Sequence, residues 1–224
     1  MKFTITCPDC GKIHEITIDE VKPSTVKITT TAEHTANWAE VAESIYSGNS
    51  KLKVGDELTV TLKNGTEVVF VVAHLNPYDD NQIAFVLKDC LPDRHCMNDN
   101  GSNKGGFIKS DMAEYLNNDI FELLPDDLQA IIKIHPGCKC RLWLPSYTEL
   151  GGTNNNWAKK DGVPFDLFKD EKSKVKQIDG ETCNWWTRSP DAGSSINFVY
   201  VNTIGSSYYG NAFASYGVAF GFLI

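Results

Sequence analysis

The sequence predicts an α+β fold in which short strands and a few helices surround one main core. Two kinds of hydrophobic periodicity lead to this prediction, because apolar residues alternate with polar ones in some segments and recur at helical spacing in others. The chain has 224 residues, of which 42% are hydrophobic and 22% are charged. A chain of this size and composition can bury a sizeable core.

The charge balance and the apolar runs exclude several classes of protein. A net charge of −8 argues against nucleic acid as the main partner, because such binding relies on clustered lysine and arginine. No apolar run reaches the about 18 residues that a membrane-spanning helix needs, and the first residues lack the pattern of a signal peptide. We therefore expect a protein with no membrane span that is made in the cytoplasm.

Residues 1–20 are expected to form a small β-hairpin that carries two cysteines. Residues 3–6 and 13–18 alternate apolar and polar side chains on either side of a turn that contains Cys7 and Cys10. Two thiolates at C-x2-C spacing can bind one Zn²⁺. The two remaining ligands of a tetrahedral zinc site would be either His14 and another cysteine, or Cys138 and Cys140. Reduced thiols in a turn and a redox role are the alternatives.

The cysteines do not form the disulfide framework of a small secreted protein. Their number is seven, which is odd, and no export signal is visible. A reducing compartment is therefore expected. Cys90, Cys96 and Cys183 are interpreted as small buried hydrophobic residues.

Residues 21–36 have little periodicity and are interpreted as a linker or an edge segment. The main domain is expected to span 37–224. It begins with a helix, because Trp38, Val41, Ala42 and Ile45 share a helical face, and Ser47-Gly48-Asn49 ends that helix.

A hairpin and a third strand follow this helix. Residues 58–62 and 68–75 flank Asn64-Gly65, a pair that favours positive φ at both central positions of a two-residue turn. Residues 83–87 form the third strand candidate. The segment 93–106 is polar and rich in glycine and asparagine, so a surface loop is expected there.

Two helices are then predicted as core scaffolding. Ser110 is a suitable N-cap for the first, whose apolar face holds Met112, Tyr115, Leu116, Ile120 and Leu123. Pro125 starts the second, which directs Leu128, Ile131 and Ile132 inward.

The last third of the chain mixes short strands with loops. Residues 142–146 predict a buried strand followed by a turn or short helix at 147–150, and the polar segment 151–180 predicts a long loop. Further strand signals lie at 185–187, 198–201, 213–214 and 218–223. Trp143, Trp185 and Trp186 are expected in the core, with Arg188 stacked or paired with a carboxylate.

Six short motifs follow one another along the chain. They are Gly55-Asp56, Gly105-Gly106-Phe107-Ile108-Lys109-Ser110, Leu124-Pro125-Asp126-Asp127-Leu128, Leu142-Trp143-Leu144-Pro145-Ser146-Tyr147-Thr148-Glu149-Leu150, Trp185-Trp186-Thr187-Arg188-Ser189-Pro190 and Gly217-Val218. Their order and spacing resemble a bacterial and phage domain family of unknown function that is related to the C-type-lectin-like fold, and the resemblance covers roughly residues 50–224. The resemblance implies a C-type-lectin-like domain of mixed short strands and two main helices, preceded by the cysteine-containing hairpin.

The chain ending Gly217-Val218-Ala219-Phe220-Gly221-Phe222 is also similar to the variable proteins of diversity-generating retroelements and to formylglycine-generating-type domains. Those proteins often carry arginine after Gly-Phe, where this chain has Leu223. In the variable proteins, mutagenesis of template adenines diversifies a ligand-binding face near the C-terminus.

The low-charge segment 184–224 is the corresponding candidate here, since its only charged side chains are Arg188 and Asp191. Tyrosine offers large, rigid contact area, while serine and asparagine adapt their hydrogen bonds. The resemblance therefore implies a non-catalytic protein that binds a protein or glycan on a target surface. The expected ligand-binding residues are Asn197, Tyr200, Asn202, Ser206, Ser207, Tyr208, Tyr209, Asn211, Ser215 and Tyr216.

Other functions compete with this interpretation. The chain could be an ordinary family member without a diversified site, or a structural component of a phage particle or cell surface. A formylglycine-generating-type oxidase would need a copper-binding cysteine pair near the C-terminus, where only Cys183 lies. Asp79-Asp80-Asn81 and Asn98-Asp99-Asn100 offer oxygen ligands for calcium, but such clusters usually form turns.

Overall fold

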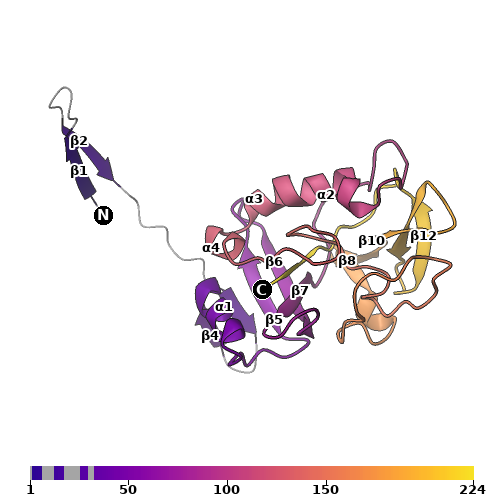
Figure 1. Cartoon of the computed structure of the whole chain (residues 1–224), viewed down its shortest axis with the longest axis horizontal. Helices are drawn as coiled ribbons and strands as arrows, with labels where there is room; N and C mark the ends of the chain where they lie inside the picture. Colours follow the sequence, from indigo (N-terminus) through magenta and orange to yellow (C-terminus); the bar gives the residue numbers. More distant parts are fainter. Residues whose placement is uncertain (1, 7–12, 18–25, 30–32) are drawn as a thin grey trace.

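The computed structural model describes residues 2–6, 13–17, 26–29 and 33–224, with side chains from residue 37 onward. The α+β class is confirmed, since the described residues form a few short helices and several antiparallel sheets (Figure 1). The N-terminal strands β1 (Lys2–Thr6) and β2 (Ile13–Thr17) pair with each other as a hairpin. The turn that carries Cys7 and Cys10 lies outside the described residues.

The central sheet is antiparallel and has the strand order β13-β7-β6-β5-β3-β4. The last strand of the chain pairs with β7, so the C-terminus returns to the middle of the molecule (Figure 1). The segment 21–36 contributes two strands to this sheet: β3 pairs with β5, and β4 pairs with β3 and forms an edge of the sheet. The strands of this sheet are β3 (Val26–Thr29), β4 (Glu33–Ala36), β5 (Glu57–Thr61), β6 (Glu67–Leu75), β7 (Ile83–Leu87) and β13 (Gly221–Leu223).

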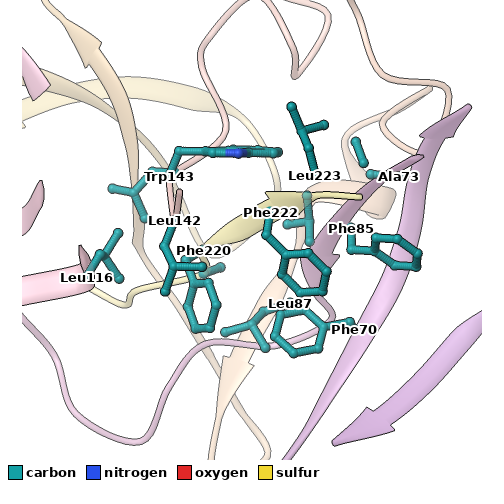
Figure 2. Close-up of a cluster of buried hydrophobic side chains, with 14 of the residues drawn as sticks. Phe70, Ala73, Phe85, Leu87, Leu116, Leu142, Trp143, Phe220, Phe222 and Leu223 are labelled. Atoms are coloured by element: carbon teal, nitrogen blue, oxygen red, sulfur yellow. The ribbon is translucent and has the colours of Figure 1, made fainter. Parts of the chain in front are cut away.

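Aromatic side chains from three neighbouring strands form the centre of the core (Figure 2). The rings of Phe85 and Phe222 are stacked with centroids 5.2 Å apart, and Phe70 meets Phe222 edge-on at 4.8 Å. Trp38 covers Phe85 and Phe222 from the helix side. All four side chains are buried. Large aromatic side chains bury much apolar area, so this cluster accounts for a large part of the hydrophobic stabilisation.

Helix α1 (Trp38–Tyr46) agrees with the prediction. Asn37 caps its N-terminus, because the Asn37 side-chain oxygen accepts a hydrogen bond of 2.7 Å from the backbone N–H of Glu40. The helix ends at Ser47, and Gly48 follows with φ of 71°. A glycine at this left-handed position stops a helix without steric cost.

The turn between β5 and β6 differs from the prediction. Leu62 and Thr66 still pair through a backbone bond of 2.8 Å, so the loop contains three residues instead of two. Only Gly65 has positive φ, at 87°, and Asn64 does not. Asn64 instead accepts a bond from the Thr66 N–H, which is typical of a type I turn followed by a glycine bulge.

The first of the two predicted scaffold helices is one continuous helical segment with an irregular centre. It runs through α2 (Asp111–Tyr115), a π-helical turn (Leu116–Ile120) and α3 (Phe121–Leu123), after a 3-10 turn at Phe107–Lys109. The Ser110 side chain accepts a bond of 3.1 Å from the Ala113 N–H, which confirms the predicted N-cap.

The second scaffold helix is shorter than expected. It contains only α4 (Asp126–Gln129). The Lys133 N–H donates to the carbonyl of Leu223 at 2.9 Å, so the chain leaves the helix to pair with β13. Leu128 and Ile132 are buried as predicted, whereas Ile131 is only partly buried.

Residues 142–146 are buried but form no strand, which corrects the prediction. The backbone of this segment is satisfied by partners on three other elements. The Asn117 amide oxygen accepts from the N–H groups of Arg141 and Leu142, each at 3.0 Å. Trp143 exchanges two backbone bonds with Gly221, and the Arg188 guanidinium donates to the carbonyl of Leu144 at 2.9 Å. A buried segment needs hydrogen-bond partners, but these need not be strand neighbours.

Two small sheets occupy the last third of the chain. The predicted loop 151–180 contains a 3-10 turn (Lys172–Lys174) and the strand β8, which pairs with β9 through a turn at Asp179 and Gly180. Both turn residues have positive φ, of 53° and 82°, as a two-residue hairpin turn requires. The strands are β8 (Lys176–Ile178), β9 (Glu181–Cys183), β10 (Trp185–Pro190), β11 (Asn197–Val201) and β12 (Ser207–Asn211).

The sheet β10-β11-β12 corrects one further expectation. Residues 213–214 do not form a strand, whereas Ser207–Asn211, which carries no strand prediction, does. The sequence of this strand, Ser-Tyr-Tyr-Gly-Asn, gives no strand signal, because apolar and polar side chains do not alternate along it. This sheet lies beside the central sheet in Figure 1.

Candidate functional site

The ten predicted ligand-binding residues lie on β11, on β12 and in the segments that follow these two strands. β11 and β12 pair in register, with Tyr200 opposite Tyr208 and Val199 opposite Tyr209. Tyr208 is 50% exposed and Tyr209 is 44% exposed, while Val199 is buried. The strand pair therefore presents tyrosine to solvent over an apolar framework.

Seven aromatic rings form a continuous series across this sheet, which we call the aromatic row. Its centre is the stacked pair Tyr208 and Tyr209, whose centroids are 4.8 Å apart with nearly parallel planes. Trp157 meets both rings edge-on, at 6.3 and 6.0 Å. On the other side, Tyr200 lies 6.0 Å from Tyr208. The members are Trp186, Tyr216, Tyr200, Tyr208, Tyr209, Trp157 and Tyr147.

A glycine on β12 makes this close packing possible. A Cβ atom at Gly210 would lie 3.1 Å from the ring of Tyr216 and 3.2 Å from that of Tyr200. These distances are shorter than ordinary carbon contacts, so a larger residue at this position would displace one of the two rings. The absence of a side chain at Gly210 thus lets Tyr216 approach Tyr200 to 4.7 Å.

The tyrosine hydroxyl groups of the aromatic row have no partner in the part of the chain that the structure describes. Within the described residues, no protein hydrogen bond is made by the hydroxyls of Tyr147, Tyr200, Tyr208, Tyr209 or Tyr216. Burial, and then the proximity of Tyr216 and Tyr208, raises the pKa of Tyr200. The Tyr200 hydroxyl therefore stays protonated at neutral pH and can donate as well as accept.

Several of the predicted polar residues shape the turns around the row. The Asn202 side-chain oxygen accepts from the N–H groups of Ile204 and Ser206, at 3.1 and 3.0 Å. The Ser206 hydroxyl donates to Glu171 at 2.6 Å. Asn211 accepts from the Phe213 N–H at 3.2 Å. These side-chain oxygens hold loops in place, which is a common role for asparagine in turns.

Three members of the row are absent from the set of ligand-binding residues predicted from sequence: Trp186, which was expected in the core, Trp157 and Tyr147. Trp157 lies in the segment interpreted as a long loop, and its carbonyl accepts from the Ala192 N–H at 2.7 Å. Tyr147 stacks on Trp157 at 6.0 Å. The only sequence signal was a tryptophan among asparagines, and nothing in the periodicity relates it to β12.

A buried ionic network lies in the same part of the molecule and joins two of the six motifs. Glu149, in the motif at 142–150, accepts two hydrogen bonds of 2.6 Å from the guanidinium of Arg188, in the motif at 185–190. Arg188 also donates to Asp161 at 2.6 Å. Glu149 further accepts from the hydroxyl of Tyr78 and from the Ser146 N–H, and its carboxylate lies 3.1 Å from Nε2 of His135. The expected pairing of Arg188 with a carboxylate is confirmed.

The Glu149–Arg188 pair at the centre of this network is ionised at neutral pH. Burial alone would raise the pKa of Glu149, but the charge of Arg188 and hydrogen bonds from His135 and Arg188 lower it to about 2. Glu149 and Arg188 are at most 1% exposed, so the pair is fully desolvated. The Tyr147 N–H donates to Ser189 at 2.9 Å, next to Arg188 in the chain. The network therefore supports the Tyr147 end of the aromatic row.

The three tryptophans predicted in the core, Trp143, Trp185 and Trp186, are all buried, which confirms that expectation. The cysteine interpretation is only partly correct. Cys183 is buried, but Cys90 and Cys96 are partly exposed. Cys96 donates to Asp99 at 2.9 Å, and this polar contact keeps its thiol at the surface.

The zinc site stays a prediction. Cys7 and Cys10 lie outside the described residues, and the side chain of His14 is not described. Cys140 donates to the carbonyl of Cys138 at 3.3 Å. Among the described residues, no group of three or more histidine, cysteine, aspartate or glutamate side chains is arranged to hold a metal ion.

Asn98 belongs to Asn98-Asp99-Asn100, one of the two clusters considered for calcium. Its side-chain amide instead donates to the carbonyl of Ser102 and accepts from the Asp111 N–H. Within the described part of the chain, no helix is long and apolar enough to cross a membrane.

Comparison with known proteins identifies one family. The profile of a family described as "Domain of unknown function (DUF6273)" matches residues 81–223. The match includes the aromatic row, β13 and every member of the ionic network except Tyr78, and it begins later than the resemblance, which was expected from residue 50. No curated protein and no solved structure matches the chain.

Proposed function

This chain belongs to the DUF6273 family, and from that premise we propose that it is a non-catalytic ligand-binding protein whose binding face is the aromatic row. The observation that carries the proposal is the stacked pair Tyr208 and Tyr209, at 50% and 44% exposure, with Trp157 against both rings. Exposed aromatic area of this kind is typical of interaction sites.

The chemistry of the row suits a protein or glycan ligand. Aromatic faces contact the apolar C–H groups of a sugar ring or a side chain, and the unpartnered hydroxyls supply hydrogen bonds for the polar groups of the same ligand. In the closing segment, Arg188 is buried and paired. Contact area and hydrogen bonding should therefore determine what the face binds.

We further infer a C-type-lectin-like fold in which the row is a diversified face, as in retroelement variable proteins of phage or prophage. Support comes from the alternation of buried framework residues, such as Phe198 and Val201, with accessible tyrosine, serine and asparagine on the same strands. A near-copy of the DNA encoding residues 185–224, differing mainly at adenines, would establish diversification. Its absence from the neighbouring DNA would favour an ordinary family member or a structural surface component.

A binding array tests the proposal. Fluorescently labelled full-length protein is applied to an array of bacterial and host oligosaccharides and to immobilised bacterial cells. Wild-type protein should be retained, and the Tyr208→Ala/Tyr209→Ala double variant should lose at least about tenfold in affinity, because two aromatic anchors are removed.

Tyr46→Ala is the matched control. Tyr46 is 43% exposed, similar to Tyr209, but it lies on α1, outside the row. The control should bind as wild type does. Equal retention of the double variant and the wild type, or loss of binding in Tyr46→Ala alone, would contradict the assignment of the row.

A further inference from the structure

We propose that Cys90 and Cys183 form a reversible disulfide, which joins the loop after β7 to the end of β9. The two residues are 93 positions apart in the chain, yet their Sγ atoms are only 3.6 Å apart. No property of the sequence pairs them, since they belong to neither C-x2-C nor C-x-C motifs. The proposal goes beyond ligand binding and does not depend on it.

Backbone hydrogen bonds hold both cysteines in this position. The Cys90 N–H donates to the carbonyl of Gln177 in β8 at 3.0 Å. Cys183 lies opposite Lys176 in the β8–β9 register. Strand β8 therefore contacts both cysteines, and the β8–β9 hairpin keeps the two thiols close together. An S–S bond is about 2.05 Å long, so oxidation requires the sulfurs to approach through side-chain rotation and a small backbone shift.

The two thiols differ in access. Cys90 is partly exposed and lines a surface cavity of about 250 Å³, together with Lys88, Asp89 and Pro92. Cys183 is 1% exposed. A small oxidant that enters the cavity therefore meets Cys90 first, and Cys183 lies directly behind it.

The charges around the pair favour a thiolate on Cys183. The hydrogen bond between the two thiols lowers the pKa of Cys183, and Arg94 and Lys176 act in the same direction, against burial and the charge of Asp89. The hydrogen bond to Cys183 and burial raise the pKa of Cys90. Lys176 itself is buried, and its ammonium group donates to the carbonyls of Leu87 and Lys88.

These observations define the two exchange steps with a low-molecular-weight disulfide, RSSR, as the oxidant. Cys90 attacks first because only Cys90 is accessible, and its raised pKa makes this the slower step. Cys90 loses its proton and attacks one sulfur of RSSR, and the RS⁻ that leaves takes up a proton, which gives a mixed disulfide on Cys90 and one RSH. The Cys183 thiolate then attacks the Cys90 sulfur, the bond to the small thiol breaks, and a second RSH leaves with a proton. Two protein thiols are oxidised to one disulfide, and RSSR is reduced to two RSH.

The disulfide would lie directly behind the aromatic row. A Cβ atom at Gly217 would be 2.6 Å from the Cys90 sulfur and 3.1 Å from the Cys183 sulfur, so this glycine leaves the space in which the sulfurs meet. Gly217 follows Tyr216, and its carbonyl accepts from the Trp186 N–H at 3.0 Å. Oxidation would therefore link the loop after β7 covalently to β9, which ends two residues before β10 begins at Trp185.

Peptide mapping of the full-length chain tests the proposal. The protein is incubated with oxidised glutathione, alkylated, digested without reduction and analysed by mass spectrometry. A peptide linking Cys90 to Cys183 should appear, should be about tenfold more abundant than links from Cys90 to Cys96 or Cys138, and should disappear after dithiothreitol. Recovery of Cys90 and Cys183 as two alkylated thiols, or as two separate glutathione adducts, would overturn it.

Two variants test the order of the steps. Cys183→Ser should accumulate a glutathione adduct on Cys90, because the resolving thiol is absent. Cys96→Ser is the matched control, since Cys96 is also partly exposed, and it should form the Cys90–Cys183 link at the wild-type rate. A Cys183→Ser protein that acquires no adduct on Cys90, under conditions that link the wild type, would overturn the assignment of Cys90 as the entry thiol.

Discussion

Glu149 is the residue at which several parts of the chain meet. It is fully buried and contacts Tyr78, His135 and Arg188, which come from three other segments, as well as Ser146 in its own segment. A buried ion pair adds little net stability relative to apolar residues, because desolvation offsets the attraction. Removing one partner is different, since it leaves an uncompensated charge in the core.

The first prediction concerns the charge of this residue. Glu149→Gln should lower the free energy of unfolding by about 3–5 kcal/mol, because Arg188 would remain buried with Asp161 as its nearest carboxylate. Urea denaturation followed by tryptophan fluorescence measures the change. Glu122→Gln, at an exposed position on α3, is the control and should change stability by less than about 0.5 kcal/mol. A loss equally small in Glu149→Gln would contradict the role of the network.

The pH dependence of stability follows from the same carboxylate. The folded-state pKa of Glu149 is lowered to about 2 from an ordinary value of 4.5, a difference that corresponds to about 3 kcal/mol. A lowered pKa means that this stabilisation is present above pH 4.5 and is lost as the pH falls towards 2. The raised pKa of His135 adds no slope there, since His135 is protonated throughout that range.

Denaturation midpoints measured across this acid range check the expectation. Wild-type stability should fall more steeply between pH 4.5 and 2 than that of Glu149→Gln, which has no carboxyl to titrate. Parallel pH profiles of the two proteins would show that folding does not lower the pKa of Glu149.

At the scale of elements, the π-helical turn explains why residues 142–146 are buried without belonging to a sheet. Asn117 lies in this turn, and its side-chain amide makes four hydrogen bonds. The nitrogen donates to the carbonyls of Ala113 and Leu142, and the oxygen accepts from the N–H groups of Arg141 and Leu142. The extra residue of a π turn changes the direction of the following side chains, and such turns recur at sites with special roles. Here the turn directs one amide at a neighbouring backbone segment.

Asn117→Ala should therefore lower the free energy of unfolding by about 2–3 kcal/mol, because the backbone groups of buried Leu142 and the N–H of Arg141 lose their partners. Thermal and urea denaturation measure the loss. Asn118→Ala changes the exposed neighbour in the same turn and serves as the control. Similar effects of the two substitutions would mean that the amide contacts do not stabilise the fold.

Local signals predicted some elements well and others poorly. Helix α1, the strands β6 and β7, and the Ser110 cap agree with the sequence, because each depends on nearby residues. The β8–β9 hairpin has an Asp-Gly turn signal but strands of only three residues, too short for periodicity. Strand β12 depends on pairing with β11, which no local pattern reveals.

The candidate site shows the same division. Tyr200, Tyr208, Tyr209 and Tyr216 were expected together from their low-charge segment, and they do contact one another. Trp157 and the pair Cys90 and Cys183 were not expected, because their proximity arises from tertiary structure between segments far apart in the chain. Composition predicted the chemistry of the face, and the fold determined its extent.

At the scale of the whole molecule, the net charge of −8 does not come from the closing segment that carries most of the row. Between residues 184 and 224 the charged side chains are Arg188, which is buried and paired, and Asp191. Long-range steering therefore has little to act on at this face.

Ligand affinity should accordingly depend weakly on salt. The dissociation constant of an array-selected oligosaccharide should change by less than about threefold between roughly 50 and 500 mM salt. Isothermal titration calorimetry at both salt concentrations measures the change. A loss of affinity of about tenfold or more would indicate that charged groups outside the row dominate binding.

The central claim, that the aromatic row contacts the ligand, is tested most directly by fluorine NMR of protein containing 3-fluorotyrosine. The chain has eight tyrosines, so each resonance can be assigned by single Tyr→Phe variants. On titration with the oligosaccharide retained most strongly on the array, the resonances of Tyr200, Tyr208, Tyr209 and Tyr216 should shift, and those of Tyr46 and Tyr115 should not. Saturable shifts at Tyr46 or Tyr115 with none in the row would contradict the account.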